Sequence, residues 1–379
     1  MHTLKLIHSG PIYRNPNPGY QHITALFSHV VQMGDQELLC TYNRGQAMYA
    51  TDLTFWQARS TDGGQSWSEH SPITDRSHDD RHYSYHGPFV SRMGDGLLVI
   101  VAFRVDRSDP ERPIFNEITG GLTSLDVILQ RSSDNGRSWS PPEVIAIAEG
   151  LVITPSCGIV ELADGTWFLA YDQWHGFDEP GPYRPRTIAF FSTDQGDTWG
   201  NPVTFADGAE VGKGFWHGRI MPMVDGRLFT LFWSADMSQN GRDLPLHRSF
   251  GSADGRNWTF PEATNLPGQT NNAVDLGDGL MVAIYTSRTG PQPGFRVALS
   301  TDNGLTWDLD NQLLLWDATG RDRLGINAPE SYPRSHDTIA FGAPTALRLL
   351  DGDIFVSFWC NEMSITHIRC ARLRVSEGG

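Results

Sequence analysis

Side chains able to bind and act on a charged molecule recur beside the apolar, strand-like runs of this chain. Ahead of such runs stand His22, His86, His217 with Arg219, and Asn272, and just behind them stand Arg44, Arg104, Asp172, Arg288, Trp359 and Glu362. Imidazoles transfer protons near neutral pH, guanidinium groups bind carboxylates through paired hydrogen bonds, and aromatic faces stack on apolar ring surfaces. This inventory is typical of a pocket for a charged sugar.

The apolar runs pair into predicted hairpins, because each is followed by a turn containing Asp or Gly and then by a second apolar run. Six such pairs are expected, at residues 23–32 with 38–42, 88–92 with 97–103, 158–162 with 166–171, 220–224 with 227–233, 273–276 with 280–285, and 345–349 with 354–359. Each pair predicts the inner half of one repeating unit.

An eight-residue motif, Ser-x-Asp-x-Gly-x-x-Trp, recurs downstream of these pairs. Complete copies stand at residues 60–67, 132–139, 192–199 and 300–307, and residues 252–258 form a copy that is one residue short. We expect the Asp to accept backbone N–H bonds inside a turn, the Gly to take positive φ, and the Trp to fold back onto the adjoining strands. This motif, called the Asp box below, therefore predicts a structural hairpin clamp. Its spacing of roughly 50 to 70 residues suits a four-stranded unit.

The sequence thus predicts an all-β fold, a six-bladed β-propeller in one domain. The approximate blades are residues 17–75, 84–148, 152–206, 213–266, 269–318, and 338–375 together with 3–13. The last blade has three strands of its own, and residues 3–13 are expected to supply the fourth, so that no sheet edge stays open. The alternative is a small separate N-terminal element.

Composition excludes several classes of protein. Glycine (39) and proline (23) are frequent and aromatic residues make up 11%, which favours a turn-rich β protein over a helical or disordered one. A net charge of −15 opposes binding to nucleic acid or anionic lipid. No apolar run approaches the roughly 20 residues of a membrane helix, and the first residues do not resemble a signal peptide, so a cytoplasmic location is expected.

The four cysteines, Cys40, Cys157, Cys360 and Cys370, lie in apolar runs without CxxC spacing. Buried free thiols are therefore expected, in keeping with a reducing compartment. His78, His82 and His86 recur at intervals of four, but they fall in a predicted loop rather than on a helix face. We expect no metal site and no cofactor, a carbohydrate as the partner, and no binding of nucleic acid or membrane.

Five Asp boxes on a six-blade periodicity resemble the sialidase (neuraminidase) superfamily of propellers, over essentially the whole chain. The resemblance implies a ligand at the mouth of the central channel, where the first strand of each blade begins and the second ends. The residues named at the outset would then line that mouth. Because the superfamily includes sialidases, other exo-glycosidases, lyases and non-catalytic sugar binders, function depends on the pocket.

Three positions match the superfamily's active site. Asp52, eight residues before the first Asp box, stands where the family has its acid/base aspartate. Arg288 is similar to one arginine of the triad that binds the substrate carboxylate, and Arg44 matches an arginine at the end of the first blade's second strand. The resemblance therefore implies an acidic substrate.

Three other positions depart from the pattern. His22 stands where the family has its first triad arginine, and His217 lies in the segment that would hold the family's glutamate. The head of the last blade, residues 341–345, lacks the tyrosine nucleophile, although Tyr332 lies in the preceding loop. The resemblance thus predicts the fold and leaves the chemistry open.

Two chemistries and one non-catalytic alternative fit these residues. In the favoured one, an exo-glycosidase removes a terminal, acidic sugar, with Asp52 as general acid and Asp172, Asp236 or Glu362 as base or nucleophile. In the second, a polysaccharide lyase neutralises a uronate with Arg44, Arg219 and Arg288, while His22, His86 or His217 removes the acidified proton. The third is a glycan-binding propeller without activity. The candidate catalytic residues are Asp52, His22, His217 and Glu362.

Overall fold

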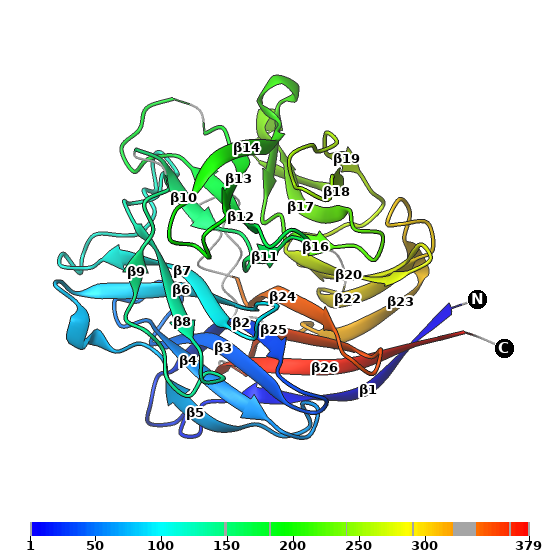
Figure 1. The fold of residues 1–379 in the computed structure, drawn as a ribbon, viewed down its shortest axis with the longest axis horizontal. Helices are drawn as coiled ribbons and strands as arrows, with labels where there is room; N and C mark the ends of the chain where they lie inside the picture. The colour runs from blue at the N-terminus through cyan, green and yellow to red at the C-terminus, as the bar shows by residue number, and fades with distance from the viewer. Residues whose placement is uncertain are drawn as a thin grey trace.

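The computed structural model describes residues 2–147, 150–181, 183–239, 241–289, 292–320, 339–363 and 365–377. These residues form six antiparallel β-sheets that follow one another around a common centre (Figure 1). Helical structure in the described ranges is confined to three short 3₁₀ turns, η1 (Arg76–His78), η2 (Ala209–Val211) and η3 (Met237–Gln239). The predicted all-β, six-bladed propeller is confirmed.

The first three blades follow the chain order. Blade 1 contains β2 (Thr24–Gln32), β3 (Leu38–Gly45), β4 (Thr54–Ser60) and β5 (Ser68–Pro72). Blade 2 contains β6 (Tyr83–Arg92), β7 (Leu98–Asp106), β8 (Asp126–Ser132) and β9 (Glu143–Val144). Blade 3 contains β10 (Val152–Pro155), β11 (Val160–Glu161), β12 (Trp167–Trp174), β13 (Arg186–Ser192) and β14 (Gly200–Asp207).

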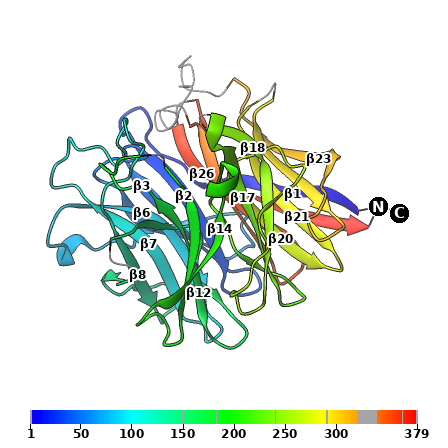
Figure 2. The ribbon, with the colours of Figure 1, turned by 90° about the horizontal axis from the view of Figure 1, so that it is seen from above.

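The remaining blades complete the ring. Blade 4 contains β15 (Lys213–Trp216), β16 (Met221–Pro222), β17 (Leu228–Asp236), β18 (Arg242–Gly251) and β19 (Glu262–Ala263). Blade 5 contains β20 (Asn271–Gly277), β21 (Leu280–Ser287), β22 (Gly294–Ser300) and β23 (Asp308–Asp317). Blade 6 contains β24 (Phe341–Arg348), β25 (Ile354–Glu362), β26 (Ile365–Glu377) and β1 (His2–Tyr13). Figure 2, turned by 90°, shows strands of successive blades running between two opposite faces.

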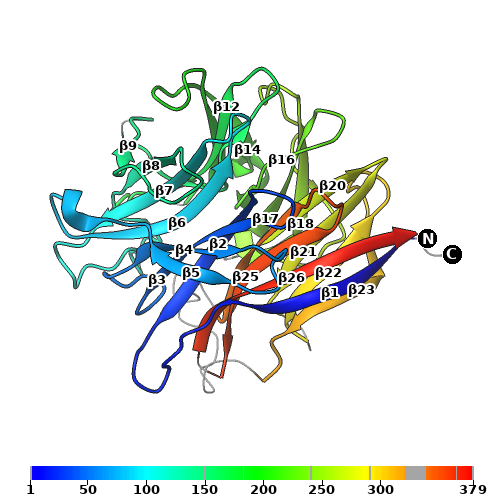
Figure 3. The same ribbon diagram turned by 60° about the horizontal axis from the view of Figure 1, so that its bottom comes forward.

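The N-terminal strand closes the ring. β1 pairs antiparallel with β26, from His2 opposite Glu377 to Tyr13 opposite Ile368. The two strands lie side by side in Figures 1 and 3, where blue β1 follows red β26. The predicted closing strand is confirmed, and the alternative of a separate N-terminal element is wrong.

Each complete Asp box folds as the predicted clamp. In the first, Ser60 Oγ contacts Asp62 Oδ1 at 2.8 Å and accepts the backbone N–H of Gly64 at 2.8 Å. Asp62 Oδ1 also accepts the backbone N–H of Ser66 at 2.9 Å, and the Trp67 indole donates to the Gly64 carbonyl at 3.2 Å. Gly64 has φ of 90°, a conformation that favours glycine. The motif therefore specifies its turn locally.

The box glycines also join neighbouring blades. A Cβ on Gly64 of blade 1 would strike Phe355 of blade 6, and one on Gly304 of blade 5 would lie 2.9 Å from Phe229 of blade 4. The same relation to the preceding blade holds for Gly136, Gly196 and Gly255. The glycine of each box is therefore needed for two reasons: its φ is positive, and its backbone packs closely on the preceding blade.

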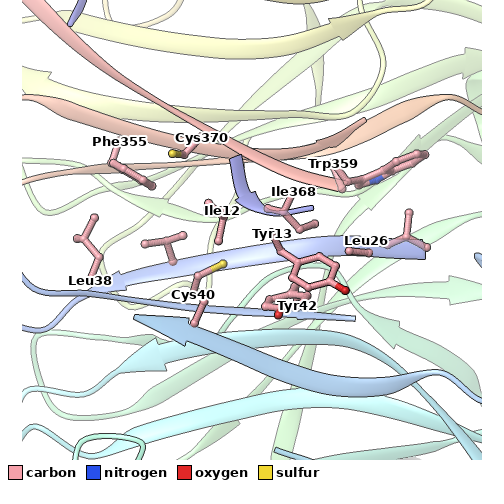
Figure 4. Packing of buried hydrophobic residues seen from close by; sticks show 14 of the residues in the cluster. Ile12, Tyr13, Leu26, Leu38, Cys40, Tyr42, Phe355, Trp359, Ile368 and Cys370 are labelled. Carbon is pink, nitrogen blue, oxygen red and sulfur yellow. The ribbon is translucent and has the colours of Figure 1, made fainter. Parts of the chain in front are cut away.

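The hydrophobic core is divided among the blade interfaces. One cluster of buried apolar residues lies between each adjacent pair of sheets, including the pair that closes the ring. Figure 4 shows the cluster between blades 6 and 1, where Phe355 and Trp359 face Leu38, Tyr42 and their neighbours. The four cysteines are free and buried, as predicted. No helix in the described ranges is long and apolar enough to cross a bilayer.

Five of the six innermost strands are interrupted, which the sequence did not predict. In β2, β6 and β24 the pairing register shifts near Phe27, Gly87 and Ala343, and all three residues have positive φ. In blade 3 the inner strand is divided into β10 and β11. In blade 4, β15 is separated from β16 around His217, whose φ is 55°. The inner strands predicted to start at residues 88, 158 and 220 therefore begin earlier. Such bulges redirect side chains next to binding sites.

Candidate functional site

His22, Arg44 and Asp52 line one pocket of about 560 Å³ on blade 1. The guanidinium carbon of Arg44 lies 4.1 Å from the ring centroid of Trp56 and 5.3 Å from that of Tyr13, so stacking fixes its position. Asp52 Oδ1 accepts the backbone N–H of Gln46 at 3.1 Å, which orders the loop of residues 46–53. The pocket therefore brings together an imidazole, a cation and a carboxylate, all three named from sequence.

His217 and Asp172 form a close pair between blades 4 and 3. His217 Nδ1 lies 3.1 Å from Asp172 Oδ2, and both carboxylate oxygens lie 3.1 Å from the backbone nitrogen of His217. The Asp172 side chain is 1% exposed, whereas that of His217 is 33% exposed. The buried carboxylate therefore orients the imidazole and leaves Nε2 as its outward nitrogen. A histidine held in this way can act as a general acid or base.

Arg288 of blade 5 lies near the propeller axis, because it contacts three other blades. Its guanidinium carbon is 5.5 Å from the Trp233 ring of blade 4, and it donates to the Phe341 carbonyl of blade 6 at 3.3 Å. Its third neighbour is the Tyr49 phenol, from blade 1. Burial lowers the pKa of Arg288 to about 10, so it still carries its charge at neutral pH. It offers a desolvated cation for an anionic ligand.

These contacts link into what we call the axial cluster, comprising Tyr49, Asp172, His217, Trp233 and Arg288. The rings of His217 and Trp233 lie 5.9 Å apart, which joins the His217–Asp172 pair to Arg288 through Trp233. Tyr49 belongs to the same loop as Asp52, so this loop connects the axial cluster to the blade 1 pocket. Burial raises the pKa of Tyr49 and keeps the phenol protonated.

Two predicted binding residues are held by partners inside the protein. Arg219 of blade 4 bonds to His29 Nε2 of blade 1 at 2.9 Å and lies against Phe89 of blade 2, so it bridges blades. His86 is 1% exposed, stacks on Phe103 with ring centroids 5.0 Å apart, and its Nε2 lies 2.8 Å from the Ser84 hydroxyl. Burial lowers the pKa of His86 to about 3, which keeps it neutral. Both side chains are thus held by contacts inside the protein, and their roles in ligand binding stay predictions.

Arg104 and Trp359 were also predicted to bind substrate. Arg104 bonds to Asp126 at 3.0 Å and its guanidinium carbon lies 3.9 Å from the Tyr83 ring, both within blade 2. Trp359 is 2% exposed and packs in the cluster between blades 6 and 1, which leaves no ring face for a sugar. Asn272 is partly exposed, and its Oδ1 accepts the backbone N–H of Ala273 at 2.7 Å. Arg44, Asn272 and Arg288 remain candidates for direct contact.

Glu362, predicted to be catalytic, belongs to a network of its own. Its Oε1 accepts from the Trp316 indole at 3.0 Å, and its Oε2 lies 3.1 Å from His367 Nε2 and 3.3 Å from an Arg369 nitrogen. These partners bind both carboxylate oxygens and connect blades 5 and 6, and the catalytic role of Glu362 stays a prediction. Asp236, another candidate for the base or nucleophile, is the last residue of β17, and its Oδ1 accepts from the backbone N–H and the hydroxyl of Ser238.

One group in the described residues has the donor types of a metal site. The ligand atoms of Cys360, Glu362 and His367 all lie within 4.8 Å of one another. His367 Nδ1 lies 3.2 Å from the Ile365 carbonyl. Because the group also contains Arg369, its contacts fit an ion-pair network.

Sequence reasoning did not single out Trp174, Tyr183 or Trp216, which lie around His217 together with Trp233. The rings of Trp174 and Trp233 are 6.5 and 5.9 Å from the His217 ring. Nearness in the sequence to the predicted site residues could have revealed two of them, because Trp174 follows Asp172 by two positions and Trp216 directly precedes His217. Tyr332, noted from sequence, lies outside the described residues.

Comparisons with known proteins agree with this architecture. Residues 36–340 match the protein family described as BNR repeat-like domain. A sialidase from Micromonospora viridifaciens is 27% identical over 227 residues, which are 52% of this chain and 34% of that protein. The chain therefore matches about a third of the length of this relative.

Solved structures share the fold at low sequence identity. A Dyadobacter fermentans protein of unknown function superposes with a TM-score of 0.72 at 17% identity, covering 98% of this chain and 99% of its own. A Hadza microbial sialidase gives a TM-score of 0.67 at 18% identity, with 96% and 68% covered. A leech intramolecular trans-sialidase gives 0.61 at 12% identity, with 98% and 70% covered. At these identities the likeness concerns the fold alone.

Proposed function

The chain belongs to the family of BNR repeat-like domains within the sialidase superfamily, and we propose that it is a carbohydrate-active enzyme that removes a terminal acidic sugar from a glycan. The observation that carries this proposal is the position of Arg288 in the axial cluster. Arg288 contacts the Trp233 ring, and the Trp233 ring in turn contacts His217, which is paired with Asp172. The cation can bind the carboxylate of an acidic sugar, the aromatic face can stack on its ring, and the oriented histidine can accept a proton from water. Binding of carbohydrate by relatives named sialidases agrees with this substrate class.

In the proposed hydrolysis, Arg288 binds the sugar carboxylate and Arg44 supplies a second positive charge. Asp52 protonates the oxygen of the departing glycan, while His217 Nε2 takes a proton from the water that attacks the anomeric carbon. Asp172 stabilises the resulting imidazolium across the 3.1 Å contact. The base is thus a histidine, because Asp172 is buried behind it and Asp236 and Glu362 are bound elsewhere.

The His217–Asp172 pair also favours a second candidate, a lyase that acts on a uronate. His217 would remove the proton beside the carboxylate that Arg288 neutralises, and the glycosidic C–O bond would break to form a carbon–carbon double bond. Tyr49, kept protonated by burial, would donate to the leaving oxygen.

One assay separates these functions. The full chain is incubated with sialosides, uronate oligosaccharides and neutral aryl glycosides, and products are analysed by mass spectrometry. Hydrolysis adds one water to the cleaved products, whereas elimination leaves an unsaturated uronate of unchanged total mass. Cleavage of an acidic substrate with water uptake supports the glycosidase, and cleavage without it supports the lyase. If no acidic substrate is cleaved, the enzymatic proposal is wrong and a binding protein remains.

A further inference from the structure

Three side chains of blade 6, those of Cys360, Glu362 and His367, present metal-binding atoms on one face of a β-hairpin. Cys360 and Glu362 are two positions apart on β25, so their side chains point to the same face of the sheet. His367 of β26 is the direct cross-strand partner of Cys360 and shares that face. Strand pleat and pairing register therefore bring the three together, and we call them the blade 6 triad.

The donor atoms of the blade 6 triad lie at separations close to those around a tetrahedral ion. His367 Nε2 is 3.1 Å from Glu362 Oε2 and 3.7 Å from Cys360 Sγ, and all three atoms lie within 4.8 Å of one another. Zinc bonds of about 2.0–2.3 Å to nitrogen, oxygen and sulfur place such atoms about 3.4–3.6 Å apart at tetrahedral angles. One ion can therefore contact all three atoms after small movements of the side chains.

The hydrogen bonding of His367 favours a metal ion among these atoms. Nδ1 lies 3.2 Å from the Ile365 carbonyl, which can only accept, so Nδ1 carries a proton. A proton on Nε2 would serve the Glu362 carboxylate, and a proton on Sγ of Cys360 would serve Nε2. These two hydrogen bonds exclude each other, because Nε2 cannot donate and accept at once. A metal ion satisfies all three atoms together.

The surroundings hold the blade 6 triad in place. Cys360 and His367 are fully buried. The Trp316 indole of blade 5 donates to Glu362 Oε1 at 3.0 Å, and Arg369 Nη1 donates to Oε2 at 3.3 Å. Hydrogen bonds of this kind orient the ligands around protein metal sites. The ion pair with Arg369 thus fixes the carboxylate, while its positive charge limits the affinity for a cation.

We infer that the blade 6 triad binds zinc. A thiolate and an imidazole favour zinc over calcium and magnesium, which take oxygen ligands. Cys360 binds as the thiolate, and its proton is released to the solvent. The ion links β25 to β26, and the Trp316–Glu362 bond extends this link to blade 5. The triad shares no residue with the blade 1 pocket or the axial cluster, so the inference does not depend on the proposed activity.

Cobalt(II) tests the site without an activity assay. The full chain is treated with a chelator, dialysed, and titrated with Co²⁺ in the presence of a non-thiol reductant. Cobalt bound to a thiolate gives a charge-transfer absorption band in the near ultraviolet. We expect this band to saturate at one ion per chain and to disappear when Zn²⁺ replaces Co²⁺. Cys360→Ser should abolish the band, whereas Cys370→Ser, which removes another buried thiol of β26, is the matched control and should keep it.

Metal content and thermal unfolding give a second measurement. After equilibration with Zn²⁺ and gel filtration, the parent and Cys370→Ser should retain one zinc ion per chain more than Cys360→Ser. Exposed histidines that bind zinc add the same amount to all three chains. Zinc should also raise the unfolding temperature of the parent, because it binds the folded triad.

Three results would overturn the inference. One is a parent chain that shows no charge-transfer band, which decides the question even where Cys360→Ser does not fold. Another is a band of equal intensity in the parent and Cys360→Ser. The third concerns His367→Gln, which keeps the thiol and should weaken cobalt binding by about tenfold or more. Unchanged affinity in that variant would remove the imidazole from the site.

Discussion

His217 and Asp172 come from neighbouring blades and meet at 3.1 Å, with a positive φ at His217 bringing its backbone N–H onto the same carboxylate. A single buried carboxylate thereby fixes both the peptide and the ring of the histidine. The resemblance to the superfamily implies a glutamate in this segment. The chain has His217 there, and the carboxylate of Asp172 is a suitable partner for its imidazole.

The pair is expected to move a proton during turnover. Asp172→Asn keeps an acceptor for the backbone but removes the charge that stabilises an imidazolium, and should lower kcat by about 10²- to 10⁴-fold with a small change in KM. His217→Gln should cause a loss of similar size. The measurement is steady-state kinetics against pH on whichever acidic substrate the product assay identifies. A changed KM with constant kcat would show that the pair only binds substrate.

Asp52→Ala is expected to abolish hydrolysis while the propeller stays folded, because the carboxylate lines the blade 1 pocket and its structural contact is a hydrogen bond from the Gln46 backbone. Circular dichroism and thermal unfolding check the fold, and release of reducing sugar checks the activity. Asp35→Asn, in an exposed turn between β2 and β3, serves as the control. Full activity of the Asp52 variant would remove this residue from the mechanism.

The Asp boxes should make stability depend on acid. Hydrogen bonds from the Ser66 side chain and backbone lower the pKa of Asp62 to about 2, and those from Thr198 do the same for Asp194. An aspartate in the unfolded chain titrates near 3.9. Because the folded pKa values are the lower ones, this contribution is fully present above about pH 4 and is lost as the pH falls towards 2. Solvent screening keeps the contribution of each exposed carboxylate small.

Urea unfolding at pH 5 and pH 3 tests this dependence. The parent chain should lose stability between the two, and Asp62→Asn should be less stable than the parent at pH 5 but closer to it at pH 3. If the free energies of unfolding of the parent and the variant differed equally at pH 5 and pH 3, the proposed dependence of stability on Asp62 ionisation would be wrong.

Trp199→Ala is expected to destabilise the chain by about 3–5 kcal/mol, the usual cost of removing a buried aromatic side chain. Its indole is 9% exposed, donates to the Gly196 carbonyl at 3.0 Å and packs in the cluster between blades 2 and 3. Denaturant unfolding measures the loss. Trp67→Ala, whose indole is only partly buried, should cost less. An unchanged unfolding midpoint in the Trp199 variant would argue against the clamp.

The parts of this fold that sequence predicts are those with local causes. Asp62, Gly64 and Trp67 specify their turn within eight residues, and the six recurring pairs of apolar runs predict the number of blades. The breaks in the inner strands were not predicted, because positive φ at Phe27 and His217 is imposed by packing against other blades rather than by residue type.

In the candidate site, too, the sequence predicts contacts between residues of one blade but not contacts between segments far apart in the chain. His22, Arg44 and Asp52 share a pocket because they come from one blade, where order along the chain predicts proximity. Arg219 and Glu362 were assigned to the ligand from their positions at strand ends, and the structure instead gives them partners from distant segments. Pairings between residues far apart in sequence leave no local pattern to find.

The seam between β1 and β26 has a consequence for how the chain folds. Blade 6 receives its outermost strand from residues 2–13, so this segment cannot find its hydrogen-bond partner until residues 365–377 have left the ribosome. Until then the edge of β1 and the apolar flank of blade 1 stay uncovered, the condition in which chains pair with the wrong neighbour. Pairing of β1 with β26 joins residues from the two ends of the chain and is therefore the most non-local step of folding. We expect it to be the slowest folding step.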